Sequence, residues 1–316
     1  MRILIVKTTS MGDVVHALPA ASDIVRALPG AELDWLVETP FAAIPRMHGG
    51  IRQVHALSWR KWRRQLARPD TWRAMAALRA ELRAQRYDLV IDLQGLLKSA
   101  LWARQAAAPI AGYDRRSARE PLASWAYTAR HAVPRALQAV ERCRRLAAAA
   151  LGLPQPSGAP DFGLQAPAPG WQGPDHYAVL VPSASRAAKL WPERHWVAVG
   201  RRLADQGWRP VVLWGNEAEQ SLAENIAAGC DGKVPPFLGV GEVAAVLESA
   251  RVIVGLDTGF THLGAALGRP TVGIYCDHDP GLAGLCGAGG VHSLGGKGQL
   301  PRVQDVQSRL EQLLAA

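Results

Sequence analysis

Residues 2–16 read RILIVKTTSMGDVVH and contain the two patterns from which the fold follows. Ile3 to Val6 form an apolar run, which is typical of a strand buried on both faces of a parallel sheet. From Val14 onward, apolar residues recur at intervals of three and four, which predicts a helix. Asp13 therefore lies at the first turn of a helix, directly beyond the first strand. Open α/β sheets bind their ligands at this edge.

Asp13 has two interpretations at this position. Asp is among the favoured N-cap residues of helices. A carboxylate at the ligand-binding edge of a sheet can also serve as a general base. Position alone does not separate the two roles, so the rest of the chain has to decide.

Strands and helices continue to alternate along the chain. The predicted strands cover residues 2–6, 33–37, 53–57, 88–92, 177–181, 210–214, 251–256 and 271–275. The predicted helices cover residues 71–85, 136–150, 193–205, 217–228, 242–249, a stretch from about 260, and 304–316. This alternation indicates βαβ units and parallel sheets.

A segment rich in Gly and Pro separates two such runs. Residues 152–175 contain eleven Gly or Pro among 24 positions, which neither a helix nor a central strand tolerates. We therefore expect this segment to link two domains, 1–160 and 161–316. Each is predicted to be a doubly wound, Rossmann-like α/β domain, and the two are expected to face one another across a central cleft.

Charge is distributed unevenly between the two halves. The chain holds 36 Lys and Arg against 27 Asp and Glu, a net charge of +9. Residues 1–150 hold 24 against 12, or +12, and residues 151–316 hold 12 against 15, or −3. A basic half predicts a polyanionic partner, such as nucleic acid, an anionic membrane or a phosphorylated acceptor. A basic surface without a partner is the alternative.

Several protein classes are disfavoured. No apolar stretch approaches the ~20 residues that span a bilayer, and we expect no secretory signal. Four cysteines without a C-x-x-C pair predict reduced thiols in a cytoplasm. The glycine motifs of dehydrogenases and P-loop enzymes are missing. CDHDPG at 276–281 resembles a metal site but lies in a Pro/Gly turn, so we expect no metal.

The stretch 252–275, VIVGLDTGFTHLGAALGRPTVGIY, predicts a ligand site in the second half. Asp257, Thr258 and Gly259 lead from a buried strand into a helix that carries His262. A helix N-terminus has free N–H groups and the positive end of the helix dipole, which suit a pyrophosphate. Asp257 and His262 could hydrogen-bond a sugar. A capped helix with an internally bonded histidine is the alternative.

Two further loops follow strands that should end at the same edge. Ser183, Ser185 and Lys189 follow the first strand of the second half, where hydroxyls and a cation could meet phosphate oxygens. Glu219 follows the next strand, where a carboxylate could accept from both hydroxyls of a ribose. A solvated carboxylate that the helix dipole favours is the alternative for Glu219.

Basic residues gather in three segments of the first half. WRKWRRQ (59–65), DLQGLLKSA (92–100) and AREPLAS (118–124) contain cations suited to carboxylates and phosphates. Aromatic and basic clusters also bind single-stranded nucleic acid or an anionic leaflet. Asp13 in such surroundings would repel nucleic acid but would serve as a general base. We therefore expect no nucleic-acid partner.

Five segments together resemble the ADP-heptose:lipopolysaccharide heptosyltransferases of glycosyltransferase family 9. They read MRILIVKTTSMGDVVHALPA, DLQGLLKSA, AREPLAS, AAKLWPERHW and DTGFTHLGAALGRPT. The resemblance covers essentially the whole chain, and LQGLLKSA and AREPLAS favour the heptosyltransferase I group over heptosyltransferase II.

The resemblance implies a GT-B fold, with the acceptor in the N-terminal domain and ADP-heptose in the C-terminal one. It implies an inverting transfer of L-glycero-D-manno-heptose from ADP-heptose to the Kdo of Kdo2-lipid A, in lipopolysaccharide inner-core biosynthesis. No cofactor or metal would be obligatory. The enzyme would be cytoplasmic and peripherally associated with the anionic inner-membrane surface.

The resemblance also implies roles for individual residues. Asp13 resembles the general base. The donor-binding positions would be Ser183, Ser185, Lys189, Glu219, Leu238, Asp257, Thr258, Gly259 and His262, with Leu238 packed on the adenine. The acceptor-binding positions would be Ser10, Gly12, Arg60, Arg63, Gln94, Lys98 and Arg119.

The sequence departs from the family pattern at two places. Ala184-Ser185 stands where two adjacent hydroxyl residues are usual, and Cys276-Asp277-His278 stands where an uncharged, Gly-containing turn is usual. The alternative functions are heptosyltransferase II or another sugar-nucleotide transferase of the same fold. A non-enzymatic polyanion-binding protein is a more distant alternative.

Overall fold

Each half of the chain folds around its own parallel sheet. The computed structural model describes residues 1–315. It separates the chain into unit 1, Met1–Gly163, and unit 2, from Leu164 onward. This division lies three residues beyond the expected boundary at 160, inside the Pro/Gly-rich segment. The expected α/β class is confirmed in both units.

The sheet of unit 1 has six strands in the order β3-β2-β1-β4-β5-β6, and every neighbouring pair is parallel. The strands are β1 (Arg2–Val6), β2 (Glu32–Glu38), β3 (Ile51–Leu57), β4 (Leu89–Asp92), β5 (Ile110–Tyr113) and β6 (Ala129–His131). This order is that of doubly wound nucleotide-binding sheets. The strand order reverses between β1 and β4, where Val6 lies beside Asp92.

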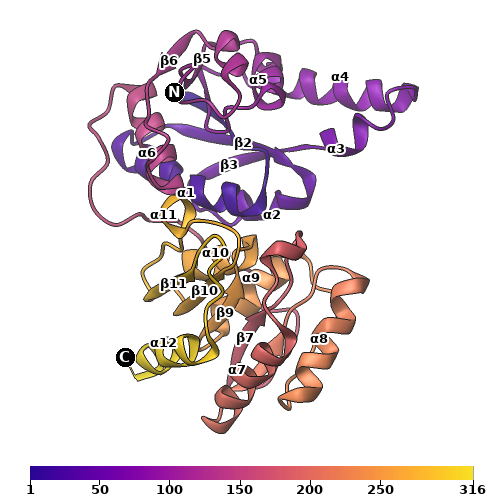
Figure 1. Ribbon diagram of the computed structural model, residues 1–316. Coiled ribbons are helices and arrows are strands. Elements are labelled where there is room, and N and C mark those ends of the chain that lie inside the picture. Colours follow the sequence, from indigo (N-terminus) through magenta and orange to yellow (C-terminus); the bar gives the residue numbers. More distant parts are fainter. Residues whose placement is uncertain (316) are drawn as a thin grey trace. The chain divides into compact units, whose positions relative to one another are not determined.

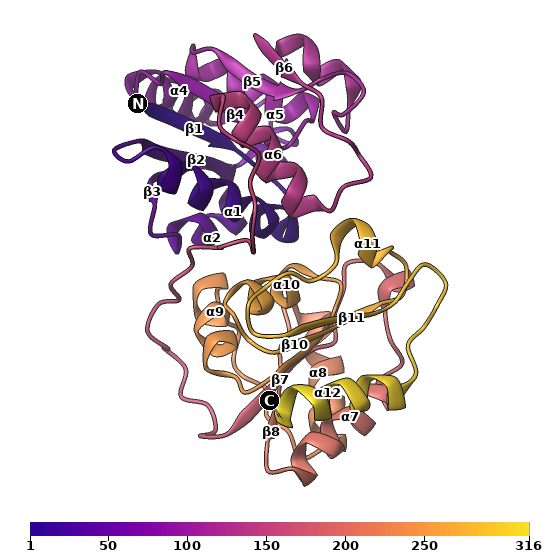
Figure 2. The same ribbon diagram turned by 90° about the vertical axis from the view of Figure 1, so that its left-hand side faces the viewer.

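Helices cover both faces of this sheet (Figures 1 and 2). They are α1 (Met11–Ala27), α2 (Ala43–Arg46), α3 (Trp59–Trp62), α4 (Pro69–Ala84), α5 (Leu97–Ala103) and α6 (Ala139–Leu151), with 3₁₀ turns η1 (Thr39–Phe41), η2 (Arg104–Ala106) and η3 (Pro121–Ala126). Helices α1 and α6 pack together on one face. On the other face, Leu4 and Val6 share a buried core with Leu78 of α4 and Trp102 of α5.

The sheet of unit 2 has five parallel strands in the order β11-β10-β9-β7-β8. They are β7 (Tyr177–Val181), β8 (Arg209–Val212), β9 (Ile253–Leu256), β10 (Thr271–Tyr275) and β11 (Val291–Gly295). Counted within the unit, this is the other common doubly wound order, 2-1-3-4-5. Here the order reverses between β7 and β9, where Val181 lies beside Gly255.

Helices also cover both faces of the second sheet (Figure 1). They are α7 (Glu193–Asp205), α8 (Glu217–Gly229), α9 (Val240–Ser249), α10 (Gly259–Ala266), α11 (Pro280–Ala283) and α12 (Val303–Ala315), with the 3₁₀ turn η4 (Ala187–Lys189). Helices α7, α8 and α12 bury Trp196, Ile226 and Leu310 in a single core with Leu180 of β7. Helices α9 and α10 pack on each other, and α10 packs on β9 and β10.

The sequence patterns do not predict three of the strands, β5, β6 and β11. β6 has only three residues, which are exposed or half-buried. All five residues of β11 are at least partly exposed. Because β6 and β11 lie at sheet edges, they bury too few side chains to produce a clear apolar pattern. The predicted helix over 71–85 begins earlier, at Pro69, because proline is favoured in the first helical turn.

Within residues 1–315, no helix combines the length and the apolar character needed to cross a membrane. No disulfide joins the four cysteines within residues 1–315, and three of them are buried. The same residues contain no cluster of three His, Cys, Asp or Glu side chains that could hold a metal ion.

Candidate active site

The predicted site residues follow the strands at which each sheet reverses its order. In unit 1, Asp13 follows β1 and Lys98 follows β4; in unit 2, Lys189 follows β7 and Asp257 follows β9. Doubly wound sheets form their ligand crevice at this point, beyond the carboxyl ends of the strands. Each unit therefore has one candidate site of its own.

The two oxygens of Asp13 have different surroundings. Asp13 is the third residue of α1, and Ser10 is its N-cap. Oδ2 accepts hydrogen bonds from the Ser10 N–H at 2.9 Å, the Ser10 hydroxyl at 3.2 Å and the Arg119 guanidinium at 3.3 Å. Among residues 1–315, no group donates a hydrogen bond to Oδ1. One oxygen thus caps the helix, and the other can accept a proton.

Asp13 is ionised at neutral pH. Its side chain is 27% exposed. Burial raises the pKa of Asp13, but Lys7, Arg119 and the Ser10 N–H together lower that pKa below its usual value. Lys7 is itself buried and donates to the Leu93 carbonyl at 2.9 Å.

Gln94 positions the loop that precedes Asp13. Its side-chain oxygen accepts from the Thr8 N–H at 2.9 Å and the Thr9 N–H at 3.1 Å. Gln94 is only 2% exposed, and its side-chain nitrogen is buried without a partner among the described residues. Its one free group for a ligand is therefore this amide nitrogen, while its oxygen is already used within the fold.

Asp92 organises the DLQGLLKSA segment from below. It is fully buried at the end of β4 and accepts hydrogen bonds from Gln94 N, Gly95 N, Ser99 Oγ and Tyr127 Oη. Burial raises the pKa of Asp92, although these bonds act in the opposite direction. Asp92 therefore shapes the loop rather than contacting a ligand.

The DLQGLLKSA and AREPLAS segments are bonded to each other. Glu120 Oε2 accepts from the Leu97 N–H at 2.6 Å, at the start of α5, and the Glu120 N–H donates to the Gly95 carbonyl at 3.0 Å. Lys98 of α5 donates to the Thr9 hydroxyl at 2.6 Å. This bonding brings Arg119 and Lys98 to the Asp13 loop, although more than eighty residues separate each from it in sequence.

The sequence patterns did not single out Glu38, whose carboxylate interacts with the positive charges of Lys98, Arg60 and Arg63. It ends β2 and is 1% exposed. Burial raises the pKa of Glu38, against the charges of Lys98, Arg60 and Arg63. Burial, with Arg60 and Arg63, lowers the pKa of Lys98. A carboxylate at the end of a buried strand is the signal that identified Asp13, and it could have identified Glu38.

In unit 2, Asp257 binds two of the predicted donor-site residues. Its Oδ2 lies 2.5 Å from the Lys189 Nζ and its Oδ1 lies 3.1 Å from the His262 Nε2. Lys189 also donates to the Asp257 carbonyl at 3.0 Å. Burial raises the pKa of Asp257, but His262 and Lys189 outweigh burial and hold that pKa far below its usual value. Lys189 is therefore already neutralised in part before any phosphate binds.

Helix α10 begins at Gly259, directly after Asp257 and Thr258, as the sequence predicts. Thr258 is the N-cap residue, but its hydroxyl makes no cap bond and lies 3.3 Å from the Thr261 hydroxyl. Thr261 donates to the Leu256 carbonyl at 2.6 Å. The first N–H groups of a helix lack intrahelical acceptors, so those that begin at Gly259 are suited to an anion.

The remaining donor-site predictions fall on two loops with different surroundings. Ser183 Oγ is buried without a partner among residues 1–315, whereas Ser185 is exposed. Glu219 accepts from Gly215 N at 2.9 Å and from Asn216 Nδ2 at 2.7 Å. Both Glu219 oxygens therefore bond within its own loop, and a ribose would have to share or replace these contacts.

Leu238 is 8% exposed and directly follows the exposed Phe237 in sequence. Phe237 is 64% exposed and meets Trp214, which follows β8, with 5.6 Å between ring centroids. Trp214 is fixed by a 2.8 Å hydrogen bond to the Pro235 carbonyl. The chain beside Leu238 thus carries aromatic surface, which suits a base ring.

The unusual turn at 276–278 has a structural explanation that the sequence did not provide. Asp277 lies 3.3 Å from the guanidinium of Arg186, which belongs to the loop after β7. The charge in this turn therefore pairs with a neighbouring loop of the same unit.

Comparison with known proteins identifies close relatives. The profile of glycosyltransferase family 9 (heptosyltransferase) matches residues 75–311. Lipopolysaccharide heptosyltransferase 1 of Pseudomonas aeruginosa is 42% identical over 298 residues, which are 92% of this chain and 83% of that protein. The solved structure of Escherichia coli heptosyltransferase WaaC with ADP is 38% identical in sequence, with a TM-score of 0.91. The match covers 99% of this chain and 100% of that chain.

A second solved structure, E. coli heptosyltransferase WaaC with ADP-2-deoxy-2-fluoro heptose, is 36% identical. Its TM-score is 0.87, with 100% of this chain and 99% of that chain covered. These similarities extend across both units and correspond to the GT-B type of α/β fold with two parallel sheets.

Proposed function

This chain belongs to glycosyltransferase family 9, the heptosyltransferases, and we propose that it transfers heptose from ADP-heptose to the Kdo of Kdo2-lipid A. Membership makes it a glycosyltransferase and sets aside the non-enzymatic alternative. The donor proposal is supported by the WaaC structures with ADP and with an ADP-heptose analogue. The choice of acceptor is supported by the relatives named heptosyltransferase 1 and by the basic charge of unit 1.

The observation that carries the proposal is the hydrogen bonding and the lowered pKa of the Asp13 carboxylate. Its Oδ2 is fixed by three hydrogen bonds, its Oδ1 accepts none within residues 1–315, and its pKa is lowered. Such a carboxylate is oriented, charged and able to accept a proton. A lowered pKa makes it a weaker base, but keeps all of it in the reactive form at neutral pH.

In the proposed reaction, the acceptor hydroxyl attacks the anomeric carbon of the heptose as its proton passes to Asp13 Oδ1. The new C–O bond forms on the face opposite to the bond that breaks, so the configuration inverts. The electron pair of the broken bond leaves with ADP. Asp13 later returns the proton to solvent, and no cofactor is consumed.

Unit 2 would bind the donor. The N–H groups at the start of α10, together with Lys189 and Ser185, would stabilise the charge that develops on the ADP diphosphate. Asp257 and His262 would bond the heptose, Glu219 the ribose, and Leu238 would pack on the adenine. We propose that these groups need no obligatory metal.

Unit 1 would bind the anionic acceptor. Arg60, Arg63, Lys98 and Arg119 are suited to its carboxylates and phosphates, and Ser10, Gly12 and Gln94 complete the predicted set. We also propose that the enzyme acts at the cytoplasmic face of the inner membrane, bound peripherally to its anionic surface.

The test is to incubate the protein with ADP-heptose and Kdo2-lipid A, with and without EDTA, and to measure both ADP release and the mass of the acceptor. We expect a heptose-sized mass gain that EDTA does not prevent. Because general-base catalysis contributes roughly 10²–10⁴ in rate, Asp13→Asn should reduce turnover by about that factor. Calorimetric ADP affinity should be unchanged.

Asp70→Asn is the matched control, since Asp70 is a first-turn carboxylate of α4 that pairs with Arg73 at 2.7 Å. It should retain full activity. If Asp13→Asn lost ADP affinity in parallel with turnover, Asp13 would be structural rather than catalytic. ADP release without a mass gain would show that the acceptor is wrong, and competition with other sugar nucleotides would test the donor.

A further inference from the structure

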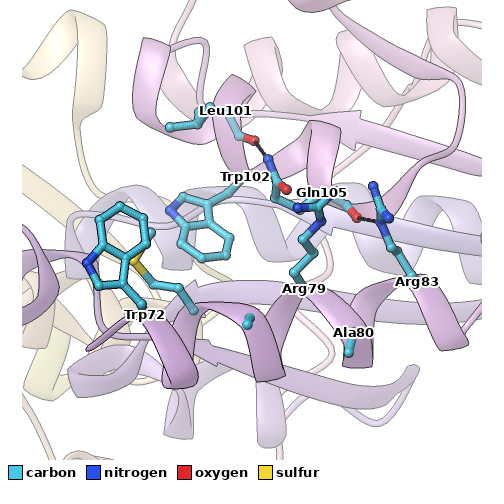
Figure 3. A pocket seen from close by; sticks show the side chains of 9 residues that line it. Trp72, Arg79, Ala80, Arg83, Leu101, Trp102 and Gln105 are labelled. Carbon is cyan, nitrogen blue, oxygen red and sulfur yellow. Dashed lines mark hydrogen bonds between the residues drawn. The ribbon is translucent and has the colours of Figure 1, made fainter. Parts of the chain in front are cut away.

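A groove on unit 1 lies between α4 and the segment formed by α5 and η2 (Figure 3). Its volume is about 440 Å³. The lining residues are Trp72, Met75, Ala76, Arg79, Ala80, Arg83, Leu101, Trp102 and Gln105. None of them is acidic, and none belongs to the acceptor or donor sites described above.

The groove has an apolar wall that water reaches. Trp72 is 55% exposed and Leu101 is 49% exposed. The indole N–H of Trp72 donates to the Leu66 carbonyl at 2.7 Å, so the polar end of this side chain is satisfied within the fold. Its ring is left as apolar surface. An exposed apolar patch of this kind marks a binding surface for a protein or a membrane.

Cations line the same groove. Arg79 makes no ion pair or hydrogen bond with any of residues 1–315, and Arg83 only donates to the Gln105 carbonyl at 3.4 Å. In Figure 3, Arg79 lies between Trp102 and Arg83, and Arg83 lies beside Gln105 at the end of the groove away from Trp72. An aromatic wall with uncompensated arginines matches the interface of an anionic bilayer, where tryptophan rings lie at the headgroups and arginines meet lipid phosphates.

The groove is continuous with the elements that carry the acceptor-site cations. Helix α5 carries Lys98 as well as Leu101 and Trp102. Helix α3, which carries Arg60, packs on the same Trp102: the ring centroids of Trp59 and Trp62 lie 6.4 Å and 5.5 Å from it. A surface that binds at this groove would therefore lie next to α3 and α5.

We propose that the groove between α4 and α5 is the face by which unit 1 docks on an anionic lipid bilayer. This inference rests on the proposed function, because that function supplies an amphiphilic acceptor embedded in such a membrane. Trp72 and Leu101 enter the headgroup region, and Arg79 and Arg83, one turn apart on α4, meet lipid phosphates beside them. Docking here holds the acceptor-site cations at the membrane surface.

The test is binding of the full chain to phosphatidylethanolamine vesicles containing phosphatidylglycerol, with neutral phosphatidylcholine vesicles for comparison. The variants are Trp72→Ala/Leu101→Ser and Arg79→Gln/Arg83→Gln. Each cation near an anionic surface contributes about fivefold, so the arginine pair should lose about 25-fold in affinity for the anionic vesicles. We expect the apolar pair to lose at least tenfold.

The matched control is Leu300→Ser/Arg194→Gln in unit 2, which removes an exposed leucine and an exposed arginine and should bind like the wild type. Urea unfolding like that of the wild type will show that unit 1 of each groove variant is folded, and unchanged ADP affinity will show the same for unit 2. Transfer to acceptor dispersed in detergent should also be unchanged, whereas transfer to acceptor in vesicles should fall with vesicle binding.

Three outcomes would overturn the inference in different ways. If the wild type binds vesicles and both groove variants bind equally well, the docking face is elsewhere and the membrane partner stands. If the wild type binds no vesicles but transfers heptose to dispersed acceptor, the membrane partner fails and the transferase stands. If the variants lose only self-association, the groove binds a second copy of the chain.

Discussion

At the scale of single residues, Asp13 is both a capping-box residue in the first turn of α1 and a candidate base. The sequence presents an N-cap and a base as alternatives, but in the structure Ser10 is the N-cap of α1. Asp13 Oδ2 accepts from Ser10 and Arg119, and Oδ1 is the atom proposed to take the proton. Asp257 is a similar case, because its carboxylate bonds Lys189 through one oxygen and His262 through the other. Asp13 thus keeps one oxygen without a hydrogen bond among residues 1–315, whereas both oxygens of Asp257 are bonded within unit 2.

The first prediction concerns the pH dependence of Asp13. Its pKa is lowered, so the carboxylate stays charged as the pH falls, and the transfer rate should not decline between pH 8 and pH 5 through Asp13. Arg119→Gln removes one of the charges that lower this pKa, which shifts the acidic limb of kcat/KM to higher pH. Arg115→Gln, in the same loop, should leave the limb in place. An unshifted limb in Arg119→Gln would show that Asp13 does not control it.

A second prediction concerns the Lys189–Asp257 pair, whose side chains are 17% and 11% exposed. Asp257→Asn leaves a buried cation unpaired and should lower the free energy of unfolding by about 3–5 kcal/mol at pH 7. The folded-state pKa of Asp257 is depressed, so its contribution is present above the ordinary carboxyl pKa of about 3.9 and is lost as the pH falls further. Urea unfolding at pH 7 and pH 3 should show the difference shrinking.

The double variant Lys189→Met/Asp257→Asn is the control for this pair. It removes the unpaired cation along with its partner, so it should recover part of the stability lost by Asp257→Asn. If the double variant were less stable than Asp257→Asn by the full effect of a second independent loss, the two side chains would not be coupled.

At the scale of elements, the loops after neighbouring strands hold one another in place. Glu120 accepts from the first turn of α5, which carries Lys98, and Gln94 accepts from the backbone before α1. The two motifs that distinguish the family group in the sequence are thus bonded together in space. These bonds join the loop that carries Arg119 to the start of the helix that carries Lys98.

A third prediction follows for Glu120→Ala. Loss of a side chain that caps a helix costs about 0.5–2 kcal/mol, so urea unfolding should show a decrease of about 1 kcal/mol. Because α5 carries Lys98, the KM for the acceptor should rise severalfold, while ADP affinity in unit 2 should not change. Glu217→Ala, which removes a first-turn carboxylate of α8, is the control. An unchanged acceptor KM would show that α5 does not need this cap.

At the scale of the whole molecule, the two units differ in charge as well as in strand order. Residues 1–163 hold 24 Lys and Arg against 13 Asp and Glu, or +11, and residues 164–316 hold 12 against 14, or −2, which together give +9. The basic unit is the one proposed to bind an acceptor with carboxylates and phosphates. The near-neutral unit is the one proposed to bind ADP-heptose.

A fourth prediction uses this difference. Salt shortens the screening length from about 10 Å at 0.1 M to about 3 Å at 1 M. Raising the NaCl concentration should therefore increase the KM for the acceptor strongly and the Kd for ADP only slightly. Steady-state kinetics and calorimetry over the same salt series would measure both. Equal salt dependence of the two would contradict the proposed division of binding between the units.

The sequence by itself determined the fold class, the two-part organisation and the strand ends that carry the sites. It could do so because buried strands, helical spacing and Gly/Pro-rich linkers are local patterns, readable over a few residues. Asp13, Asp257 and the start of α10 were found in this way. The short edge strands β6 and β11 were not, because they bury too few residues to leave a pattern.

Only the tertiary structure decided which of these residues meet. Arg119 reaches Asp13, Lys98 reaches Thr9, Lys189 reaches Asp257, and Arg186 reaches Asp277, all across long stretches of chain. Such pairs depend on how parallel strands are ordered in each sheet, and strand order is set by packing of whole helices and strands rather than by local spacing. For the same reason, the free oxygen of Asp13 and the groove beside α4 could be seen only in the folded chain.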